Sequence, residues 1–345
     1  MSSSTSSSKW LPKPRKVITY PLPDDPTGGA IFLYGQPSAT HIAVFCAGFP
    51  DDHENGQSFC FRLAEESDTL IGLMCLPGYD DRTDKPWTSH KRNGYSFDDM
   101  ANAVREVVKI LRQESTQEKA KLIGIFHDWG VVAGMIWTNR CLGEDVNSDC
   151  PDELILFDVL GPVHKEHKND LPSHIKKTMY ELFVEVYYKV VYAIAFALQC
   201  YCSKYLGLLC FVLGSFPMTL FGFAPTLSID SNAYENRVSP LNVFRLIYMA
   251  YPYYNMFKIM FTGEWRRFIS LISLPKDFIN TPVLYLYGKE KRVMFHSDSA
   301  VKYLQREANE NRSKSNAIAI ESAGHWLYLQ KPDDCIDLVK AFITN

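Results

Sequence analysis

Three polar features stand at the ends of strand-like runs, where they could take part in catalysis. Asp128 follows the apolar run 121–126 in the stretch GIFHDWG, and residues suited to a helix come after it. His325 follows the last apolar run, and the turn 47–49 closes an early one. A carboxylate at such a bend can act as a nucleophile and a histidine as a general base. Backbone N–H groups of a Gly-containing turn can stabilise an oxyanion.

Each of these residues also has a purely structural interpretation, and the residues taken singly leave both open. Asp128 could cap the following helix by accepting hydrogen bonds from its first N–H groups. The positive end of that helix also favours an ionised carboxylate, which suits a nucleophile. Asp158, at the end of the run 153–161, could orient His325 or simply begin a turn before Gly161.

The runs that carry these residues alternate with helix-like segments along most of the chain. Apolar runs that contain β-branched and aromatic residues and end near a glycine are typical of strands buried on both faces of a sheet. The segment 96–115 predicts a helix, with Ser96 as its N-cap and apolar residues every three or four positions. This alternation predicts an α/β fold with a mainly parallel sheet and helices on both faces.

The order of the segments also predicts how the chain is divided. Residues 1–15 form a Ser-rich tail without the apolar stretch of a secretory signal, and we expect them to be disordered. Residues 16–161 and 281–345 supply the two parts of the sheet domain, and 162–280 form a helical insertion. The reactive edge of such a sheet lies at the carboxyl ends of its strands, so the insertion is expected to cap a pocket there.

Two uncharged runs, 190–203 and 205–229, lie within this insertion. The second is long enough to cross a bilayer, although Pro217, Pro225 and several glycines interrupt it. Three interpretations remain open: a cap over a lipophilic substrate, a patch at a membrane interface, and a true span. We expect an intracellular protein, either cytoplasmic or attached to a membrane through residues 190–229.

The composition excludes several other classes of function. With 36 basic and 39 acidic residues and a net charge of −3, the chain lacks the basic character of nucleic-acid-binding proteins. Nine cysteines without a CxxC pair indicate a reduced compartment rather than a disulfide framework. His164, His167 and His174 lack ligand partners at metal spacing, and we expect a solvated linker there. The sequence predicts no metal and no cofactor.

Four short motifs together resemble one known family. They are AGFPDDH (47–53), PGYDD (77–81), HDWG (127–130) and GHW (324–326). Their order and content resemble the α/β-hydrolase fold, in its epoxide hydrolase and haloalkane dehalogenase branch. The resemblance implies that Asp128 attacks a saturated carbon to form an alkyl–enzyme ester, which His325 then hydrolyses with water. It assigns the oxyanion donors to the backbone of Phe49 and Trp129.

The resemblance favours epoxides over halides as substrates. Phe49 stands where dehalogenases commonly place a halide-binding Asn, and epoxide hydrolases use cap tyrosines to protonate the ring oxygen. We expect Tyr251 and Tyr254 to contact substrate because they are three residues apart and could share a helix face. The insertion offers further candidates: Tyr187, Tyr188, Tyr192, Tyr248 and Tyr253.

The sequence departs from this family at three positions. Ala47 replaces the usual His of the oxyanion turn. Phe126 occupies a position two residues before the nucleophile where the tight elbow usually has a small residue, so it could strain or widen the turn. Lys291 stands where the orienting acid is most often found, which leaves Asp158 as the acid, with Glu290 as the alternative.

These departures leave other functions open. Haloalkane dehalogenation and hydrolysis of an ester or lipid are the alternative reactions. A catalytically impaired protein of the same fold, binding lipid or a membrane partner through its apolar insertion, is the alternative outside enzymology. In each case a small lipophilic molecule is the expected ligand.

Overall fold

The computed structural model describes residues 12–22, 25–80, 93–143, 150–163, 179–220, 243–274, 281–291 and 294–344. Strands form one sheet in the order β1-β2-β4-β3-β5-β6-β7-β8. β1, β2 and β4 pair antiparallel, and all neighbours from β4 to β8 pair parallel. The strands are β1 (Lys16–Leu22), β2 (Asp25–Tyr34), β3 (His41–Cys46), β4 (Thr69–Met74), β5 (Lys121–His127), β6 (Glu153–Phe157), β7 (Val283–Gly288) and β8 (Asn316–Ile320).

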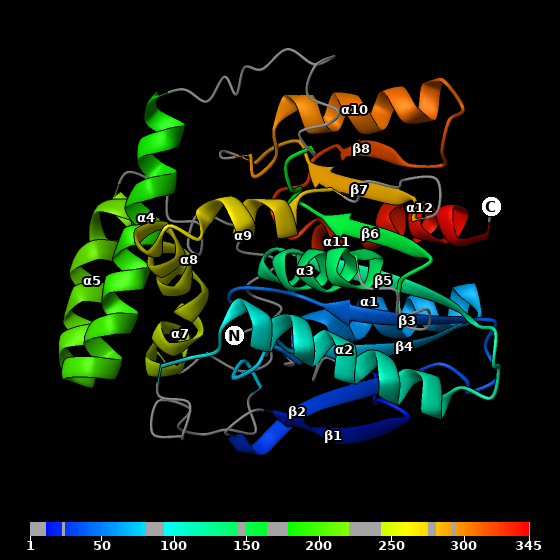
Figure 1. Ribbon diagram of the computed structural model, residues 1–345, viewed down its shortest axis with the longest axis horizontal. Helices are drawn as coiled ribbons and strands as arrows, with labels where there is room; N and C mark the ends of the chain where they lie inside the picture. Colours follow the sequence, from blue (N-terminus) through cyan, green and yellow to red (C-terminus); the bar gives the residue numbers. More distant parts are fainter. Residues whose placement is uncertain are drawn as a thin grey trace, which may run out of the picture.

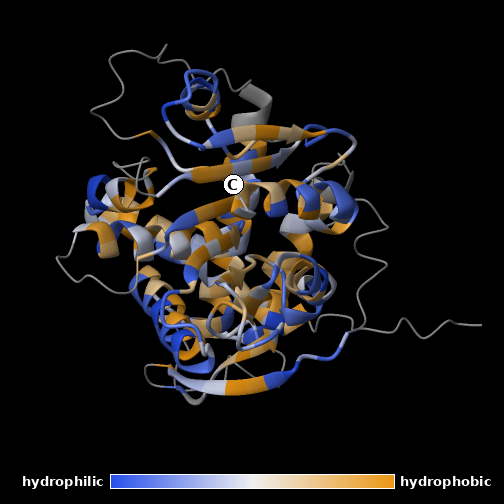
Figure 2. Cartoon of the chain, turned by 90° about the vertical axis from the view of Figure 1, so that its right-hand side faces the viewer, coloured by the Kyte–Doolittle hydropathy of each residue, from blue (hydrophilic) through white to orange (hydrophobic). Residues whose placement is uncertain are grey.

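Helices cover both faces of this sheet, as the alternating sequence predicts. One face packs against α2 (Phe97–Glu114), α3 (Trp129–Gly143) and α10 (Asp298–Asn309). The other packs against α1 (His53–Ser67), α11 (Leu327–Gln330) and α12 (Pro332–Thr344). In Figure 2 the strands through the middle of the molecule are mainly hydrophobic, whereas the surrounding helices carry both polar and apolar residues. Burial on both faces explains the continuous apolar runs of the central strands.

The start of α2 shows how local sequence fixes one of these elements. The Ser96 side chain accepts a hydrogen bond from the backbone N–H of Asp99, and the Asp99 carboxylate accepts one from the backbone N–H of Ser96. This reciprocal capping box satisfies N–H groups that the first helical turn leaves without partners. The predicted helix with its cap at Ser96 is confirmed.

A set of helices lies between β6 and β7 in the sequence, beyond the carboxyl ends of the parallel strands (Figure 1). We call this set the cap. It comprises α4 (Met179–Ala197), a π-helical segment (Leu198–Cys202), α5 (Lys204–Leu220), α7 (Val243–Met249), α8 (Tyr251–Thr262) and α9 (Trp265–Ile272). α4 packs against α5 and α8, and α9 packs against α3 of the sheet domain. Residues 221–229 of the second uncharged run, and His164, His167 and His174, lie outside the described residues.

Candidate active site

The elbow that carries Asp128 is a sharp turn between β5 and α3. β5 ends at His127 and α3 begins at Trp129, so Asp128 alone makes the turn, with a left-handed φ of 50°. Its carbonyl accepts a hydrogen bond from the N–H of Val131 at 2.9 Å. A side chain on Gly130 would lie 2.1 Å from the carbonyl oxygen of Cys46, so glycine there lets α3 approach β3. The turn lifts the Asp128 carboxylate out of the sheet, in front of the first turn of α3.

Phe126 does not crowd this turn, contrary to the concern raised by its size. Its ring is fully buried and lies against α3, where it contacts Trp137 with ring centroids 6.3 Å apart. Two glycines make the space, because a side chain on Gly124 or Gly134 would approach the ring to 2.6 or 2.3 Å. The bulky side chain therefore packs behind the elbow, and Asp128 keeps its position.

The oxyanion turn closes directly onto the nucleophile. The backbone N–H of Phe49 donates a hydrogen bond to Asp128 Oδ2 at 2.7 Å. A side chain on Gly48 would lie 2.2 Å from the backbone N of Trp129 and 2.5 Å from Asp128 Oδ2. Glycine at position 48 is thus required for the close approach of the oxyanion turn to Asp128 and Trp129. Ala47 leaves this main-chain geometry intact.

His325 and Asp158 complete the site from two other strand ends. His325 Nδ1 is hydrogen-bonded to Asp158 Oδ2, and His325 Nε2 lies 3.9 Å from Asp128 Oδ1. Asp158 is buried at the end of β6, with a left-handed φ of 63° that turns the chain there. The other candidate acid, Glu290, is exposed on the surface. The structure therefore brings Asp128, His325 and Asp158 together and leaves Glu290 outside.

Lys291 lies beside this acid and contacts it directly. Its ammonium group forms an ion pair with Asp158 Oδ2, the same oxygen that binds His325, and the Lys291 side chain is only 8% exposed. The ammonium also lies 3.7 Å from the ring centroid of Phe295. Burial raises the pKa of Asp158, but the charges of Lys291 and His325 outweigh it and lower the pKa below its usual value. The pKa of His325 is lowered by burial, by His127 and by Lys291, against the opposing charge of Asp158.

A second buried histidine supports the loop that carries the base. His127 Nε2 lies 3.0 Å from the carbonyl oxygen of His325, and His127 Nδ1 lies 3.4 Å from Asp51 Oδ2. Asp51 also accepts a hydrogen bond from the indole of Trp326 at 2.9 Å. Burial lowers the pKa of His127, but the neighbouring carboxylate of Asp51 outweighs it and raises the pKa above its usual value. The contact between His127 and Asp51 was not predicted from the sequence. The one indication in the sequence is that both residues lie within the motifs 47–53 and 127–130.

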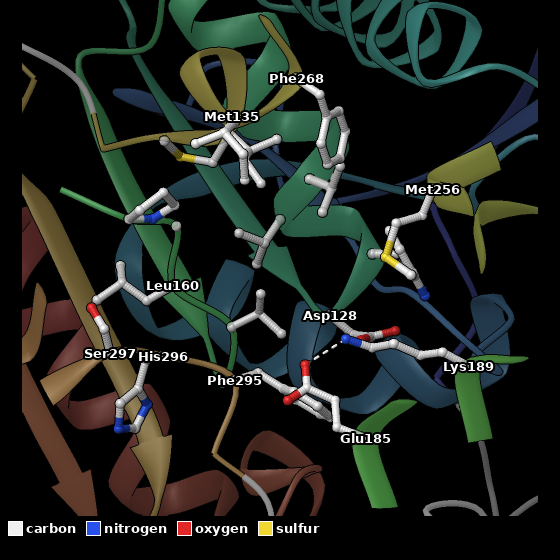
Figure 3. A pocket seen from close by; sticks show the side chains of 18 of the residues that line it. Asp128, Met135, Leu160, Glu185, Lys189, Met256, Phe268, Phe295, His296 and Ser297 are labelled. Carbon is white, nitrogen blue, oxygen red and sulfur yellow. Dashed lines mark hydrogen bonds and ion pairs between the residues drawn. The ribbon is translucent and has the colours of Figure 1, made fainter. Parts of the chain in front are cut away.

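A cavity of about 340 Å³ opens above Asp128, between the sheet domain and the cap (Figure 3). This volume suits a small organic molecule. Most of its lining is apolar, from α3, α8 and α9: Trp129, Val132, Met135, Met256, Phe268 and Ile269. Glu185 and Lys189 of α4 enter it as an ion pair.

The tyrosines at this cavity differ from the expected pair. The hydroxyl of Tyr251 donates a hydrogen bond to the carbonyl of Pro77 at 3.0 Å, and Tyr251 is fully buried outside the cavity. Tyr254 lies near Tyr201, with their hydroxyls 3.4 Å apart, and does not line the cavity either. The structure therefore places Tyr251 and Tyr254 outside the cavity that Asp128 lines.

Tyr188 of α4 and Tyr253 of α8 line the cavity instead. Their rings meet edge to face with centroids 5.9 Å apart, and Tyr253 also meets Trp129 edge to face at 5.1 Å. Burial raises the pKa of both phenols well above the usual value, and the negative charge of Asp128 raises them further. Both hydroxyls are therefore protonated at neutral pH.

No protein-family model and no curated protein sequence matches this chain. Solved structures do match it, at low sequence identity. The haloalkane dehalogenase DbeA from Bradyrhizobium elkani aligns with a TM-score of 0.60 and 13% identity, over 95% of this chain and 97% of that chain. The epoxide hydrolase of Bacillus megaterium aligns with a TM-score of 0.55 and 16% identity, over 95% of this chain and 100% of that chain.

Potato epoxide hydrolase I has a TM-score of 0.52 and 14% identity, over 95% of this chain and 99% of that chain. At such identities the likeness establishes the fold, which agrees with the eight-stranded, mostly parallel sheet and its helices on both faces. The chain has the α/β-hydrolase fold.

Proposed function

We propose that this protein is a hydrolase that converts small lipophilic epoxides to diols, with Asp128 as the nucleophile. The observation that carries the proposal is the pair of protonated phenols, Tyr188 and Tyr253, which face the same cavity as the carboxylate. A nucleophile and proton donors that line one cavity suit the opening of a three-membered ring. The apolar lining supports a lipophilic substrate.

The first step forms an ester. Asp128 attacks one ring carbon, the carbon–oxygen bond of the ring breaks, and the departing oxygen takes a proton from the phenol of Tyr188 or Tyr253. A phenolate remains, together with a hydroxyalkyl ester of Asp128. Neutral phenols are the form that can supply this proton, and burial keeps them neutral.

The second step hydrolyses that ester. His325 Nε2 takes a proton from a water molecule, which attacks the ester carbonyl of Asp128, and the N–H groups of Phe49 and Trp129 stabilise the oxyanion. The diol leaves, and the proton held by His325 restores the phenol. The 3.9 Å separation between His325 Nε2 and Asp128 Oδ1 exceeds a hydrogen bond, so the imidazole stays available to water.

Two observations favour an epoxide over a halide. Phe49 presents a phenyl ring at the position beside the nucleophile, and it packs against Tyr253 with ring centroids 5.5 Å apart. The indole of Trp129 packs edge to face on Tyr253 with ring centroids 5.1 Å apart, and it offsets part of the rise in the pKa of Tyr253. An indole packed in this way helps to position a proton donor instead of holding a halide ion.

The test uses purified protein with 1,2-epoxydecane and styrene oxide, and with 1-bromohexane as the halide probe. Wild-type protein should form diol, and Asp128→Ala should abolish it. His325→Gln should accumulate the ester, which intact-mass spectrometry detects as an increase equal to the mass of the epoxide. Tyr253→Phe should slow ester formation at least tenfold, because it removes a proton donor.

Tyr251→Phe is the matched control, since that hydroxyl lies outside the cavity. Bromide release without diol formation would show that the protein catalyses dehalogenation instead of epoxide hydrolysis. Absence of turnover in wild-type protein together with absence of a mass increase in His325→Gln would refute covalent catalysis by Asp128 and leave a non-catalytic binding role.

A further inference from the structure

The outer side of the cap exposes several large apolar side chains. We call this set the outer cap face, and it is formed by α4 and α5, which pack side by side (Figure 1). Tyr205 and Phe216 are each 65% exposed and Leu213 is 63% exposed, values unusual for large apolar residues. The other members are Phe183, Val186, Ile194, Leu206, Leu209 and Val212.

The pattern of α5 is the reverse of that expected for a helix on the surface of a water-soluble protein. Positions 205, 209, 212, 213 and 216 follow helical spacing, so they form one stripe, and this stripe faces outward. After Lys204, the part of α5 with described side chains contains no charged residue. Water-soluble helices place such a stripe against the core, so this one requires a different partner.

The charges of α4 point the same way. Among its described side chains, Glu185 and Lys189 are the charged ones, and they pair with each other and enter the cavity above Asp128. The outward positions of the helix are Phe183, Val186 and Ile194. Among the described side chains, the outward positions of α4 and the positions of α5 after Lys204 therefore carry no charge.

One helix among the described residues, Phe183–Cys202, is long and apolar enough to span a membrane, but half of that segment is buried inside the protein. Its inner side supplies Tyr188 and Tyr192, which pack on Tyr253 and Phe49. Crossing a bilayer would remove this roof from the cavity and expose the Glu185–Lys189 pair to lipid. The contacts therefore favour a helix that lies on a membrane.

The size of the stripe leads to the same conclusion. The twelve residues from Tyr205 to Phe216 cover about 17 Å at the α-helical rise of about 1.5 Å per residue. The hydrocarbon core of a bilayer is about 30 Å thick, so the stripe is too short to span it. A short helix with one apolar side fits the boundary between headgroups and acyl chains.

We propose that the outer cap face docks this protein on the surface of an anionic lipid bilayer, with α4 and α5 parallel to the membrane plane. The edges of the face carry residues suited to headgroups. The Lys204 ammonium lies 5.0 Å from the ring centroid of Tyr205, and Tyr201, three residues earlier in the chain, is 51% exposed. Lysine and tyrosine at the edge of an apolar surface match the polar and anionic boundary of a bilayer. Among the described side chains of this face, a second copy of this chain offers no negative charge that could pair with Lys204.

This docking has one consequence that rests on the proposed function. α4 forms the roof of the cavity on its inner side and touches the bilayer on its outer side. A lipophilic epoxide dissolved in the membrane therefore has to pass only through the cap to reach Asp128, without entering the surrounding water. Docking itself does not depend on the reaction at Asp128, and it can be measured without substrate.

The test is flotation of the full chain with vesicles of phosphatidylcholine that contain about 30% phosphatidylserine as the anionic lipid. Wild-type protein should float with the vesicles. Leu209→Glu combined with Leu213→Glu should weaken binding at least tenfold, because two charged side chains would enter the acyl region. Lys204→Glu should weaken binding to these vesicles more than to pure phosphatidylcholine vesicles. Phe61→Glu on α1, where Phe61 is 39% exposed, is the matched control and should bind as wild type.

Each alternative occupant gives a distinct result that would overturn the proposal. Failure of wild-type protein to bind either vesicle would exclude a lipid surface. A wild-type dimer that Leu209→Glu with Leu213→Glu converts to monomer would identify a second copy as the partner. Resistance to carbonate extraction would indicate a true span. Asp128→Ala should float as wild type, which separates this outcome from the fate of the proposed reaction.

Discussion

Replacement of Lys291 by Met should raise the pKa of His325, so that the imidazole becomes protonated at a higher pH than in the wild-type protein. Lys291 and His325 contact the same oxygen of Asp158, so two positive charges compete for one buried carboxylate when the imidazole is protonated. The wild-type charge of Lys291 lowers the pKa of His325 and keeps the imidazole in its basic form. Removal of that charge stabilises the imidazolium, so at a given pH less of the protein carries a competent base.

The expected size follows from the shared contact. Two hydrogen bonds to one oxygen place the ammonium and the imidazole about 5 Å apart. At an effective dielectric constant of about 20, unit charges at this separation repel each other by about 3 kcal/mol, or about two pH units. His325 is 14% exposed, and water screens part of this repulsion. The acidic limb of the pH–rate profile should therefore move to higher pH by about one to two units.

The assay compares the pH dependence of diol formation with a titration of the His325 ring followed by NMR, which requires no substrate. His325→Gln identifies the resonance. Lys289→Met is the matched control, because Lys289 is exposed and pairs with Glu321 on the surface. Lys291→Arg should keep the wild-type limb, since it preserves the charge.

This reasoning would be refuted if a folded Lys291→Met protein kept both the wild-type pH–rate profile and the wild-type NMR titration of His325. Loss of one partner of a buried ion pair commonly costs about 3–5 kcal/mol, so the variant should also melt earlier. If it does not fold, Lys291→Arg still provides a test, because a limb displaced in spite of the retained charge would show that charge is not the cause.

Three further predictions follow from the same geometry. Gly134→Val should lower the free energy of unfolding by about 1–3 kcal/mol, seen in denaturant titration, because its side chain would overlap the ring of Phe126. Gly48→Ala should reduce turnover about 100-fold and lower the free energy of unfolding by about 1–3 kcal/mol, because its side chain would force the oxyanion turn away from Asp128 and Trp129. Asp51→Asn should remove stability that the raised pKa of His127 provides. That stability is present in full below about pH 6.5 and declines as the pH rises through the folded pKa of His127, so the melting temperatures of variant and wild type should converge at high pH.

The sequence by itself determined the main architecture. Apolar runs with β-branched residues, alternating with amphipathic segments, predicted the mostly parallel sheet and its helices on both faces. Ser96 predicted the start of α2. These features depend on residues close together in the chain, and hydrophobic periodicity and helix capping act over such short distances. The motif order likewise placed Asp128 and His325 at strand ends that the topology brings to one edge.

Only the tertiary structure decided which side chains meet at that edge. It joined Asp158 to His325 and to Lys291, which are 167 and 133 residues away in sequence, and it left Glu290 on the surface.

It also placed Tyr188 and Tyr253 at the cavity and Tyr251 and Tyr254 outside it, and it gave Phe126 room through Gly124 and Gly134. Each of these outcomes depends on the direction of a side chain across an interface between distant elements. Sequence spacing carries no information about such contacts, because only the packing of sheet, helices and cap fixes them.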